Sequence, residues 1–195
     1  RAGQATGNGT MGLTVDAIMN QTGQIAFETQ AMLGTAGGTT DDKAIFIGDG
    51  QDTVELVRKG DAFEGSTVST LNITTDGGGI NKFGQVAVDA ILSDGRDVAI
   101  LATPEIHWRN AGSSLWDTGD NWTLGLNPGD PHDVFIDATN TTTVTGPAAD
   151  VTINALQVGG GAGFSTLRLN QGGNLTVTGD LDITTNGTLD QDVGT

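Results

Sequence analysis

Histidine, serine and carboxylate side chains are the groups in this sequence whose spacing could support catalysis. His132 lies in the segment GDPHD, between Asp130 and Asp133. No second histidine follows at the spacing of a zinc site, so we predict a surface turn there. A nucleophilic serine would need a sharp G-x-S-x-G turn, whereas Ser113 and Ser114 follow a glycine in a predicted loop. We therefore expect that the chain is not an enzyme.

Four oxygen-bearing side chains form the best candidate for a metal site. They are Asp117, Asp120, Asn121 and Asp130, all within residues 107–133. Several carboxylate and amide oxygens on one loop suit Ca²⁺, although their order is not that of an EF-hand. Calcium is the one cofactor that the sequence suggests. The alternative is a solvated acidic loop.

A second carboxylate pair lies near the end of the chain. Asp180 and Asp182 are two residues apart, so they share one face of a predicted strand. They could flank a sugar or bind calcium. A solvated face opposite Leu181 and Ile183 is the favoured interpretation.

All three tryptophans, Trp108, Trp116 and Trp122, stand in one loop-rich segment, residues 107–133. Indole rings can stack on sugars, but three tryptophans in a chain of this length more often form a core at a domain junction. Further along, the glycines of Gly159–Phe164 resemble a phosphate-binding loop. No helix-forming stretch follows them, so we predict a hairpin turn.

The triplet Asn-x-Thr occurs seven times. Outside the cell such a triplet can carry a glycan. It also suits a turn that leads into a strand, and we favour that interpretation, since Asn20 begins a repeated motif. The glycosylation candidates are Asn8, Asn72, Asn121, Asn140, Asn174 and Asn186.

The composition restricts the class of protein. The 24 acidic and 8 basic residues give a net charge of −16, which argues against a nucleic-acid partner because phosphate binding needs a basic surface. The chain has 31 glycines and no cysteine, so disulfides are excluded and many short strands with tight turns are expected. No stretch is apolar enough to span a membrane.

Internal repetition is the strongest pattern. NQTGQIAF begins at Asn20 and NKFGQVAV at Asn81, an offset of 61 residues. In each copy alternate residues are apolar, which predicts a half-buried strand, and a second apolar run follows. Asp94-Gly95 is a strong hairpin turn, so each copy predicts a β-hairpin. The alternating positions are Ile25, Phe27, Thr29, Ala31 and Leu33 in the first copy and Val86, Val88, Ala90 and Leu92 in the second.

The segment between the hairpins explains the glycine-rich opening of the sequence. It predicts a third strand around Val54 and Leu56, followed by RKGDAFEG, which matches RAGQATG at residues 1–7. We therefore expect the sequence to open in the loop of a repeat whose preceding strand is vacant. The second hairpin has no third strand after it. An alternating segment follows the opening and could fill such a vacancy in another copy: Leu13, Val15, Ala17 and Met19.

Two domains are predicted, residues 1–104 and 105–195, because Pro104 precedes a change in composition. The first is expected to be a repeat-built antiparallel sheet or barrel with an N-terminal arm. The second combines the tryptophan loop with short alternating strands, a ladder of the β-sandwich or short β-solenoid type. The fold class is all-β.

The motif N-x-x-G-x-x-A-F, with Val88 replacing Phe in its second copy, resembles the tandem-repeat NxxGxxAF proteins of secreted bacterial origin. Those proteins often carry a variable C-terminal surface anchor, and the resemblance covers roughly residues 1–103. Residues 107–190, with WDTGDNW and GNLTVTGDL, look like the passenger-type β-repeats of large secreted bacterial proteins. The resemblance implies secretion and a β-rich architecture, and it brings no catalytic residue.

These observations favour a structural subunit of an extracellular, pilus-like bacterial fibre. A sheet that lacks one strand is filled by another chain or aggregates, so donation of the N-terminal strand would give a head-to-tail homopolymer. The alternative is a monomeric module of a surface adhesin that binds glycans through the tryptophan loop. A polysaccharide-acting enzyme is a weaker third hypothesis.

Overall fold

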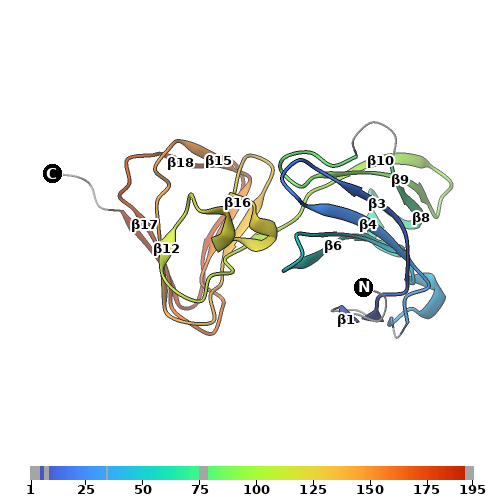
Figure 1. Ribbon diagram of the computed structural model, residues 1–195, viewed down its shortest axis with the longest axis horizontal. Coiled ribbons are helices and arrows are strands. Elements are labelled where there is room, and N and C mark those ends of the chain that lie inside the picture. The colour runs from blue at the N-terminus through green and yellow to red at the C-terminus, as the bar shows by residue number, and fades with distance from the viewer. Residues whose placement is uncertain (1–4, 7–8, 34, 75–78, 192–195) are drawn as a thin grey trace. The chain divides into compact units, whose positions relative to one another are not determined.

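The computed structural model describes residues 5–6, 9–33, 35–74 and 79–191. The chain forms two compact units, residues 1–104 (unit 1) and residues 105–195 (unit 2). Within the described ranges the secondary structure consists of β-strands and three short 3₁₀ helices (Figure 1). The predicted all-β class is therefore confirmed.

The described part of unit 1 contains ten strands and one 3₁₀ helix. We call residues 5–58 repeat 1 and residues 62–102 repeat 2. The elements are β1 (Ala5–Thr6), β2 (Gly9–Thr10), β3 (Leu13–Met19), β4 (Ile25–Gln30), η1 (Gly38–Thr40), β5 (Ala44–Gly48), β6 (Thr53–Arg58), β7 (Ala62–Phe63), β8 (Ser66–Ile73), β9 (Val86–Leu92) and β10 (Asp97–Ala102).

Each repeat builds one four-stranded antiparallel sheet. The strand order is β3-β4-β5-β6 in repeat 1 and β10-β9-β8-β7 in repeat 2. The third strand predicted in repeat 1 is present as β6. The hairpin turn predicted at Asp94-Gly95 is also present, since Gly95 N–H donates to the carbonyl of Leu92 at 2.9 Å.

The N-x-x-G-Q motif forms the same turn in both repeats. The Oδ1 of Asn20 accepts hydrogen bonds from the backbone N–H groups of Thr22 (3.1 Å) and Gln24 (2.9 Å). The Oδ1 of Asn81 does the same for the residues two and four positions later, at 2.9 and 3.1 Å. The glycine of each motif has a positive φ, +91° and +74°, a region that other residues avoid. The asparagine and glycine recur in both motifs because this turn requires them.

The two sheets of unit 1 pack through unlike faces. The inner face of repeat 1 carries Ile18, Ala26, Glu28, Ile45 and Ile47, which the strand register places on one side. Strands β4 and β5 lie against β8 of repeat 2. The packed face of repeat 2 is equally defined by register and is buried: Leu71, Ile73, Val86, Val88 and Ala90.

This arrangement corrects the face predicted for the first hairpin. The alternation places Val86 and Val88 in the core, as expected, but the corresponding Ile25 is 41% exposed. Ala26 and Glu28, on the other side of the strand, are buried. On the predicted side Thr29 is buried and Phe27 is half-buried. Strand β4 also ends at Gln30, and Leu33 is exposed. The alternation was therefore read correctly, but this strand buries residues on both of its sides.

Unit 2 is a short β-solenoid, because every strand pair in its described part is parallel. Its three sheets have the orders β11-β13-β16-β19, β12-β14-β17-β20 and β15-β18. The elements are β11 (Ile106–His107), β12 (Ser114–Leu115), η2 (Gly119–Asn121), η3 (Thr123–Gly125), β13 (Asp133–Ile136), β14 (Thr142–Thr145), β15 (Val151–Ile153), β16 (Ala155–Val158), β17 (Ser165–Leu169), β18 (Leu175–Val177), β19 (Leu181–Ile183) and β20 (Gly187–Gln191).

Apolar side chains stack in columns along the solenoid. Ile106, Val134, Leu156 and Leu181 pair in successive strands, and the first three are fully or almost fully buried. The corners between strands are tight. A Cβ on Gly163 would lie 2.3 Å from the backbone of Asn140, so glycine is needed where neighbouring coils touch.

Two sequence predictions in unit 2 are wrong. Gly159–Phe164 is no hairpin turn, because it joins β16 and β17, which belong to different sheets. His132 is no surface residue, since it is fully buried. Its Nδ1 accepts a hydrogen bond from Gly129 N–H at 3.0 Å, and its backbone carbonyl accepts one from Asn154 N–H at 2.9 Å. The described residues include no helix with the length and apolarity to cross a membrane.

Candidate assembly surfaces

The strand predicted to be donated, with Leu13, Val15, Ala17 and Met19, forms β3. It pairs with β4 of its own sheet, and a bulge between Thr14 and Ala17 interrupts the pairing. It is an outermost strand, with one neighbour in the sheet. Ala17 and Met19 are exposed, and the side chains of Leu13 and Val15 lie outside the description. The strand is part of its own sheet, and its other edge is open.

Strand β10 is the corresponding outer strand of repeat 2. Repeat 1 continues from β5 into β6, whereas β10, the counterpart of β5, is the last strand of its sheet. Its Leu101 is 61% exposed. An outer strand presents unpaired N–H and C=O groups that can pair with another chain. This edge is where repeat 2 lacks the strand that repeat 1 has.

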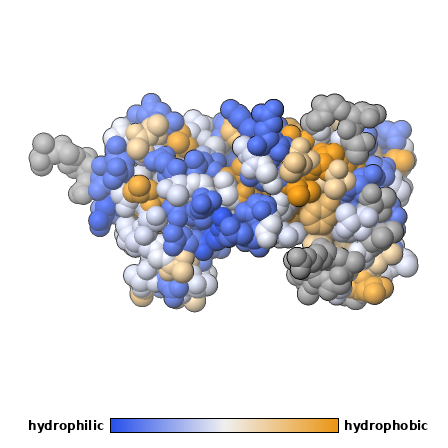
Figure 2. Space-filling view, in the orientation of Figure 1, coloured by the Kyte–Doolittle hydropathy of each residue, from blue (hydrophilic) through white to orange (hydrophobic). Residues whose placement is uncertain are grey.

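An apolar groove of about 640 Å³ crosses the outer face of repeat 1. Ala17, Ile25 and Phe27 line it, with Thr14 and Thr53 among the polar residues at its sides. Phe27 stacks on Phe46, with ring centroids 5.7 Å apart. Figure 2 shows a hydrophobic patch over the region of β3 and β4. Contiguous exposed apolar surface of this kind marks interaction sites.

The outer face of repeat 2 is also open. A smaller hollow of about 430 Å³ there is lined by Asp89, Ile91, Asp97 and Ala99, among others. Ile91 is 44% exposed. Apolar and acidic side chains therefore alternate across this face.

A third area of exposed apolar residues lies on β19 and β20, the last described strands of unit 2. Leu181, Ile183 and Leu189 continue columns that are buried in the preceding coils, yet they are 39–49% exposed. The first coil differs because the tryptophan segment covers it. Trp108, Trp116 and Trp122 are at most 5% exposed.

The tryptophans form an aromatic cluster rather than a sugar platform. Trp122 meets both other rings edge to face at 4.9 Å, and its Nε1 donates to the carbonyl of Trp116 at 2.7 Å. Since all three rings are buried, they offer no face to a glycan. The burial of the three tryptophans fits the predicted role in a core. That core lies inside unit 2.

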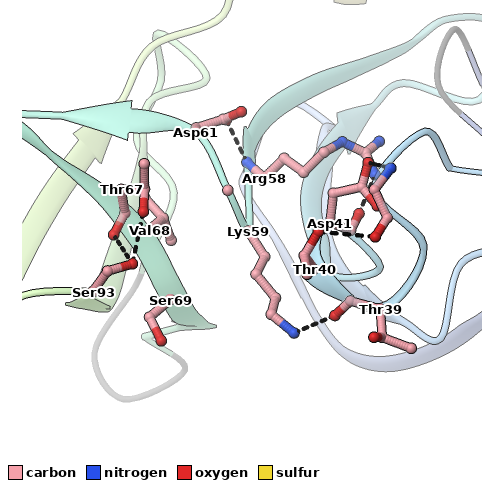
Figure 3. Close-up of a pocket in the computed structure, with 12 residues that line it drawn as sticks. Thr39, Thr40, Asp41, Arg58, Lys59, Asp61, Thr67, Val68, Ser69 and Ser93 are labelled. Carbon is pink, nitrogen blue, oxygen red and sulfur yellow. Dashed lines mark hydrogen bonds between the residues drawn. The ribbon is translucent and has the colours of Figure 1, made fainter.

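A polar cleft of about 520 Å³ lies between the two repeats (Figure 3). On one side of it, Lys59 Nζ donates to the carbonyl of Thr39 at 2.6 Å. On the other side, the hydroxyls of Thr67 and Ser93 bond to each other at 2.6 Å. None of the twelve residues that line the cleft is aromatic. The cleft is a polar seam between the repeats.

Arg58 anchors one side of this seam. Its buried guanidinium pairs with the carboxylate of Glu55 and donates to the carbonyl of Asp41 at 2.7 Å. The hydrogen bond to Glu55 is the main cause of its raised pKa, which burial opposes. A second ion pair of repeat 1 is connected to repeat 2 by a hydrogen bond from its lysine. Lys43 Nζ lies 2.8 Å from Glu28 and 3.1 Å from the Oδ1 of Asn72.

His107 is the titratable group whose environment comes closest to that of a catalytic acid or base. Its Nδ1 lies 3.0 Å from Asp137 and its Nε2 lies 3.5 Å from Glu105, and its ring stacks on Phe135. The hydrogen bond to Asp137 raises the pKa of His107, although burial opposes the rise. Its backbone N–H donates to the hydroxyl of Thr123 at 3.0 Å. The arrangement fixes the ring in place at the start of unit 2.

The calcium candidates do not come together. Among the described residues no group of three or more histidine or acidic side chains is placed to hold a metal ion, although Asp117, Asp120 and Asp130 are all described. Asn121 is buried, its amide donating to the carbonyl of Leu115 at 2.8 Å and accepting from Asn110 at 2.6 Å. Asn121 holds the tryptophan segment together, and we do not propose a calcium site.

The glycosylation candidates differ in accessibility. Asn121 is unsuitable because its side chain is buried, which corrects that prediction. Asn72, Asn140 and Asn174 are exposed. Asn186 is partly buried at a positive φ of +65°, and Asn8 lies outside the described residues. The exposed side chains bond to their surroundings, as Asn174 does to Asp150 at 2.8 Å. This fits the turn interpretation.

Sequence reasoning missed the surfaces that lie between the repeats. The sequence of either hairpin alone does not predict the inner face, where Lys43 pairs with the buried Glu28. The alignment of the two repeats could have pointed to these surfaces. When equivalent positions are buried in one repeat and exposed in the other, the exposed positions mark a contact that is not made within the chain. No protein-family model matches the chain, and no curated protein and no solved structure is significantly similar to it.

Proposed function

We propose that the chain is a structural subunit of an extracellular bacterial fibre, and that its copies associate head to tail through unit 1. The resemblance of its repeats to secreted repeat proteins supports the location. The strongly acidic composition supports it as well, since self-repulsion keeps such a subunit soluble until specific contacts form. The proposal assigns the chain no enzymatic activity.

The observation that carries the proposal is the free edge of β10. Repeat 1 adds β6 at this position and repeat 2 adds no strand among the described residues. A strand of a second copy can extend the sheet there by main-chain hydrogen bonds. A contact between unlike edges or faces leaves the second edge or face of each copy free, so it propagates as a filament when the rotation between copies does not close a ring.

Donation of β3 to another copy is the form of assembly that the sequence suggests. It requires β3 to leave β4, with which it pairs at five positions. An engineered disulfide tests this step. Thr14 and Thr29 lie directly opposite each other in the register, and the chain has no other cysteine. If β3 is donated, Thr14→Cys/Thr29→Cys assembles when reduced and stays monomeric when oxidised. Assembly of the oxidised form would exclude donation and leave assembly through intact sheets.

A second variant tests the edge itself. Leu92 N–H donates to Arg96, and antiparallel pairs alternate in hydrogen bonding, so the N–H of Ala99 points away from β9. Ala99→Pro therefore removes an edge donor without breaking a bond to β9, while Ala99→Thr keeps the donor. We expect fibres from Ala99→Thr and fewer or none from Ala99→Pro, by negative-stain microscopy. A wild-type chain that stays monomeric by light scattering at every concentration would overturn the proposed function.

A further inference from the structure

The contact between the two repeats is a template for a contact between copies. It joins the inner face of repeat 1 to the packed face of repeat 2, and these are opposite sides of equivalent sheets. Because the N-x-x-G-Q motifs are 61 residues apart, Ile25 corresponds to Val86 and Phe27 to Val88. Around Ile25 and Phe27, repeat 1 therefore leaves open the side of the sheet that repeat 2 buries, whereas Thr29 and Phe46, further along that side, are buried within repeat 1.

On the opposite side of the two sheets, repeat 1 is buried and repeat 2 is exposed. The strand registers of β4–β5 and β9–β10 make Ile45 equivalent to Ala99 and Ile47 to Leu101. Both isoleucines are fully buried by repeat 2. Their equivalents in repeat 2 are exposed. The molecule thus has two accessible areas, one around Ile25 and Phe27 and one around Ala99 and Leu101, whose equivalents are already in contact inside the chain.

We propose that the outer face of repeat 2 of one copy docks on the outer face of repeat 1 of a second copy, in the geometry that the two repeats adopt within one chain. Leu101 and Ala99 would take the places of Ile47 and Ile45, and Ile25 and Phe27 those of Val86 and Val88. The groove of about 640 Å³ beside Ile25 and Phe27 receives these side chains. The contact is heterologous, so each copy keeps a free face on which a further copy can dock.

This inference rests on the proposed function, because its partner is a second copy of the chain. It differs from strand donation in that every strand stays in its own sheet. It also explains why both faces carry exposed apolar residues at positions whose equivalents are buried in the contact between the repeats. An unrelated partner would not need both faces.

Charge limits the strength of this contact. Inside the chain, the equivalent position carries the pair Glu28–Lys43 at 2.8 Å. The repeat equivalence replaces these residues by Asp89 and Asp97 in repeat 2. Burying two acids without a cation opposes association, so the contact between copies is weaker than the internal one. Asp97→Lys restores the pair that repeat 1 has.

Variants of the two faces test the head-to-tail geometry. Ile25→Asp and Leu101→Asp each place a charge on one exposed position, and each leaves the other face intact. We expect either variant alone to be monomeric and a mixture of the two to form a one-to-one dimer, by light scattering. Leu33→Asp, at an exposed position outside both faces, should assemble like the wild type. A mixture that remains monomeric would overturn the proposed contact.

A gain of association provides the second test. We expect Asp97→Lys to lower the dissociation constant between copies about tenfold, in the range measured for interfacial charge pairs. Asp180→Lys, in unit 2, makes the same change in net charge and serves as the control. Equal effects of both substitutions would show that only net charge matters and would overturn the assignment of this face.

The two proposals fail in different ways. If fibres persist in Ile25→Asp and Leu101→Asp but disappear in Ala99→Pro, the face contact is wrong and assembly through the β10 edge stands. If the wild type never assembles but Asp97→Lys dimerises and Ile25→Asp reverses this, the fibre is wrong and the face contact stands. Circular dichroism of each variant establishes that its fold is retained.

Discussion

The side-chain amide of Asn20 donates a hydrogen bond to the backbone carbonyl of Asn81 at 3.0 Å, so the first residues of the two motif copies touch. Each asparagine also caps its own turn through Oδ1. The motif asparagine therefore caps a turn in both repeats, but only in repeat 1 does its side chain also bond to the other repeat. This asymmetry follows from packing through unlike faces.

Replacement of Asn20 by aspartate separates the two roles. Asn20→Asp keeps the Oδ1 acceptor and loses the donor to Asn81, and we expect unit 1 to lose about 0.5–1.5 kcal/mol of stability. Asn81→Asp adds the same charge but loses only a bond to the side chain of Gln85. Urea unfolding followed by far-UV circular dichroism measures both. Equal losses would contradict a specific role for the bond between repeats.

Lys43 neutralises a buried carboxylate, so its removal should be costly. Lys43→Met leaves Glu28, whose residue is 1% exposed, without its cation. We expect a loss of about 3 kcal/mol in the free energy of unfolding. The double variant Glu28→Leu/Lys43→Met removes both charges and should recover most of that loss. Because the three tryptophans lie in unit 2 and the chain has no tyrosine, tryptophan fluorescence should not change.

His107 makes the stability of unit 2 depend on pH. Its pKa is raised in the folded state, first by the hydrogen bond to Asp137. Such a group contributes stability that is fully present below its unfolded pKa of 6.5 and is lost as pH rises through the folded value. The urea midpoint read by tryptophan fluorescence should therefore fall between pH 6.5 and the folded pKa. Asp137→Asn should flatten this dependence, and an unchanged profile in that variant would exclude the pair as its cause.

The solenoid corners should tolerate no side chain where coils touch. Gly163→Ala places a Cβ 2.3 Å from the backbone of Asn140, so the backbone must shift, at about 1–3 kcal/mol. Gly112→Ala is the matched control, since its Cβ meets only the Oδ1 of Asn110, at 3.9 Å. Thermal unfolding by tryptophan fluorescence compares them. A Gly163→Ala variant as stable as the control would mean that the corner adapts.

Local patterns predicted the elements of this fold well, because the determinants are local. The alternation around Val86 and Val88 identified a strand with one buried face, and Asp94-Gly95 identified its turn. The short alternating runs after residue 133 identified a ladder, and the parallel pairing of its strands makes it a solenoid.

Long-range packing accounts for the errors. The alternation in β4 is the same whichever side is buried, and only repeat 2 decides that Ala26 faces inward and Ile25 outward. His132 looked like part of a surface turn because the strands that bury it lie elsewhere in the sequence. Asn121 looked like a calcium ligand or glycan acceptor, but its partners, Asn110 and Leu115, occupy both ends of its amide.

The short hairpins that open the two repeats have a consequence for how the chain can evolve. Ala5–Thr6 pairs with Gly9–Thr10 in the same register in which Ala62–Phe63 pairs with Ser66–Thr67, at an offset of 57 residues. Each repeat thus starts in the same way and meets its neighbour through unlike sides. Unequal recombination between the two coding segments would insert or delete a whole repeat without requiring a new kind of contact. Length is therefore a property that such a gene can change in steps.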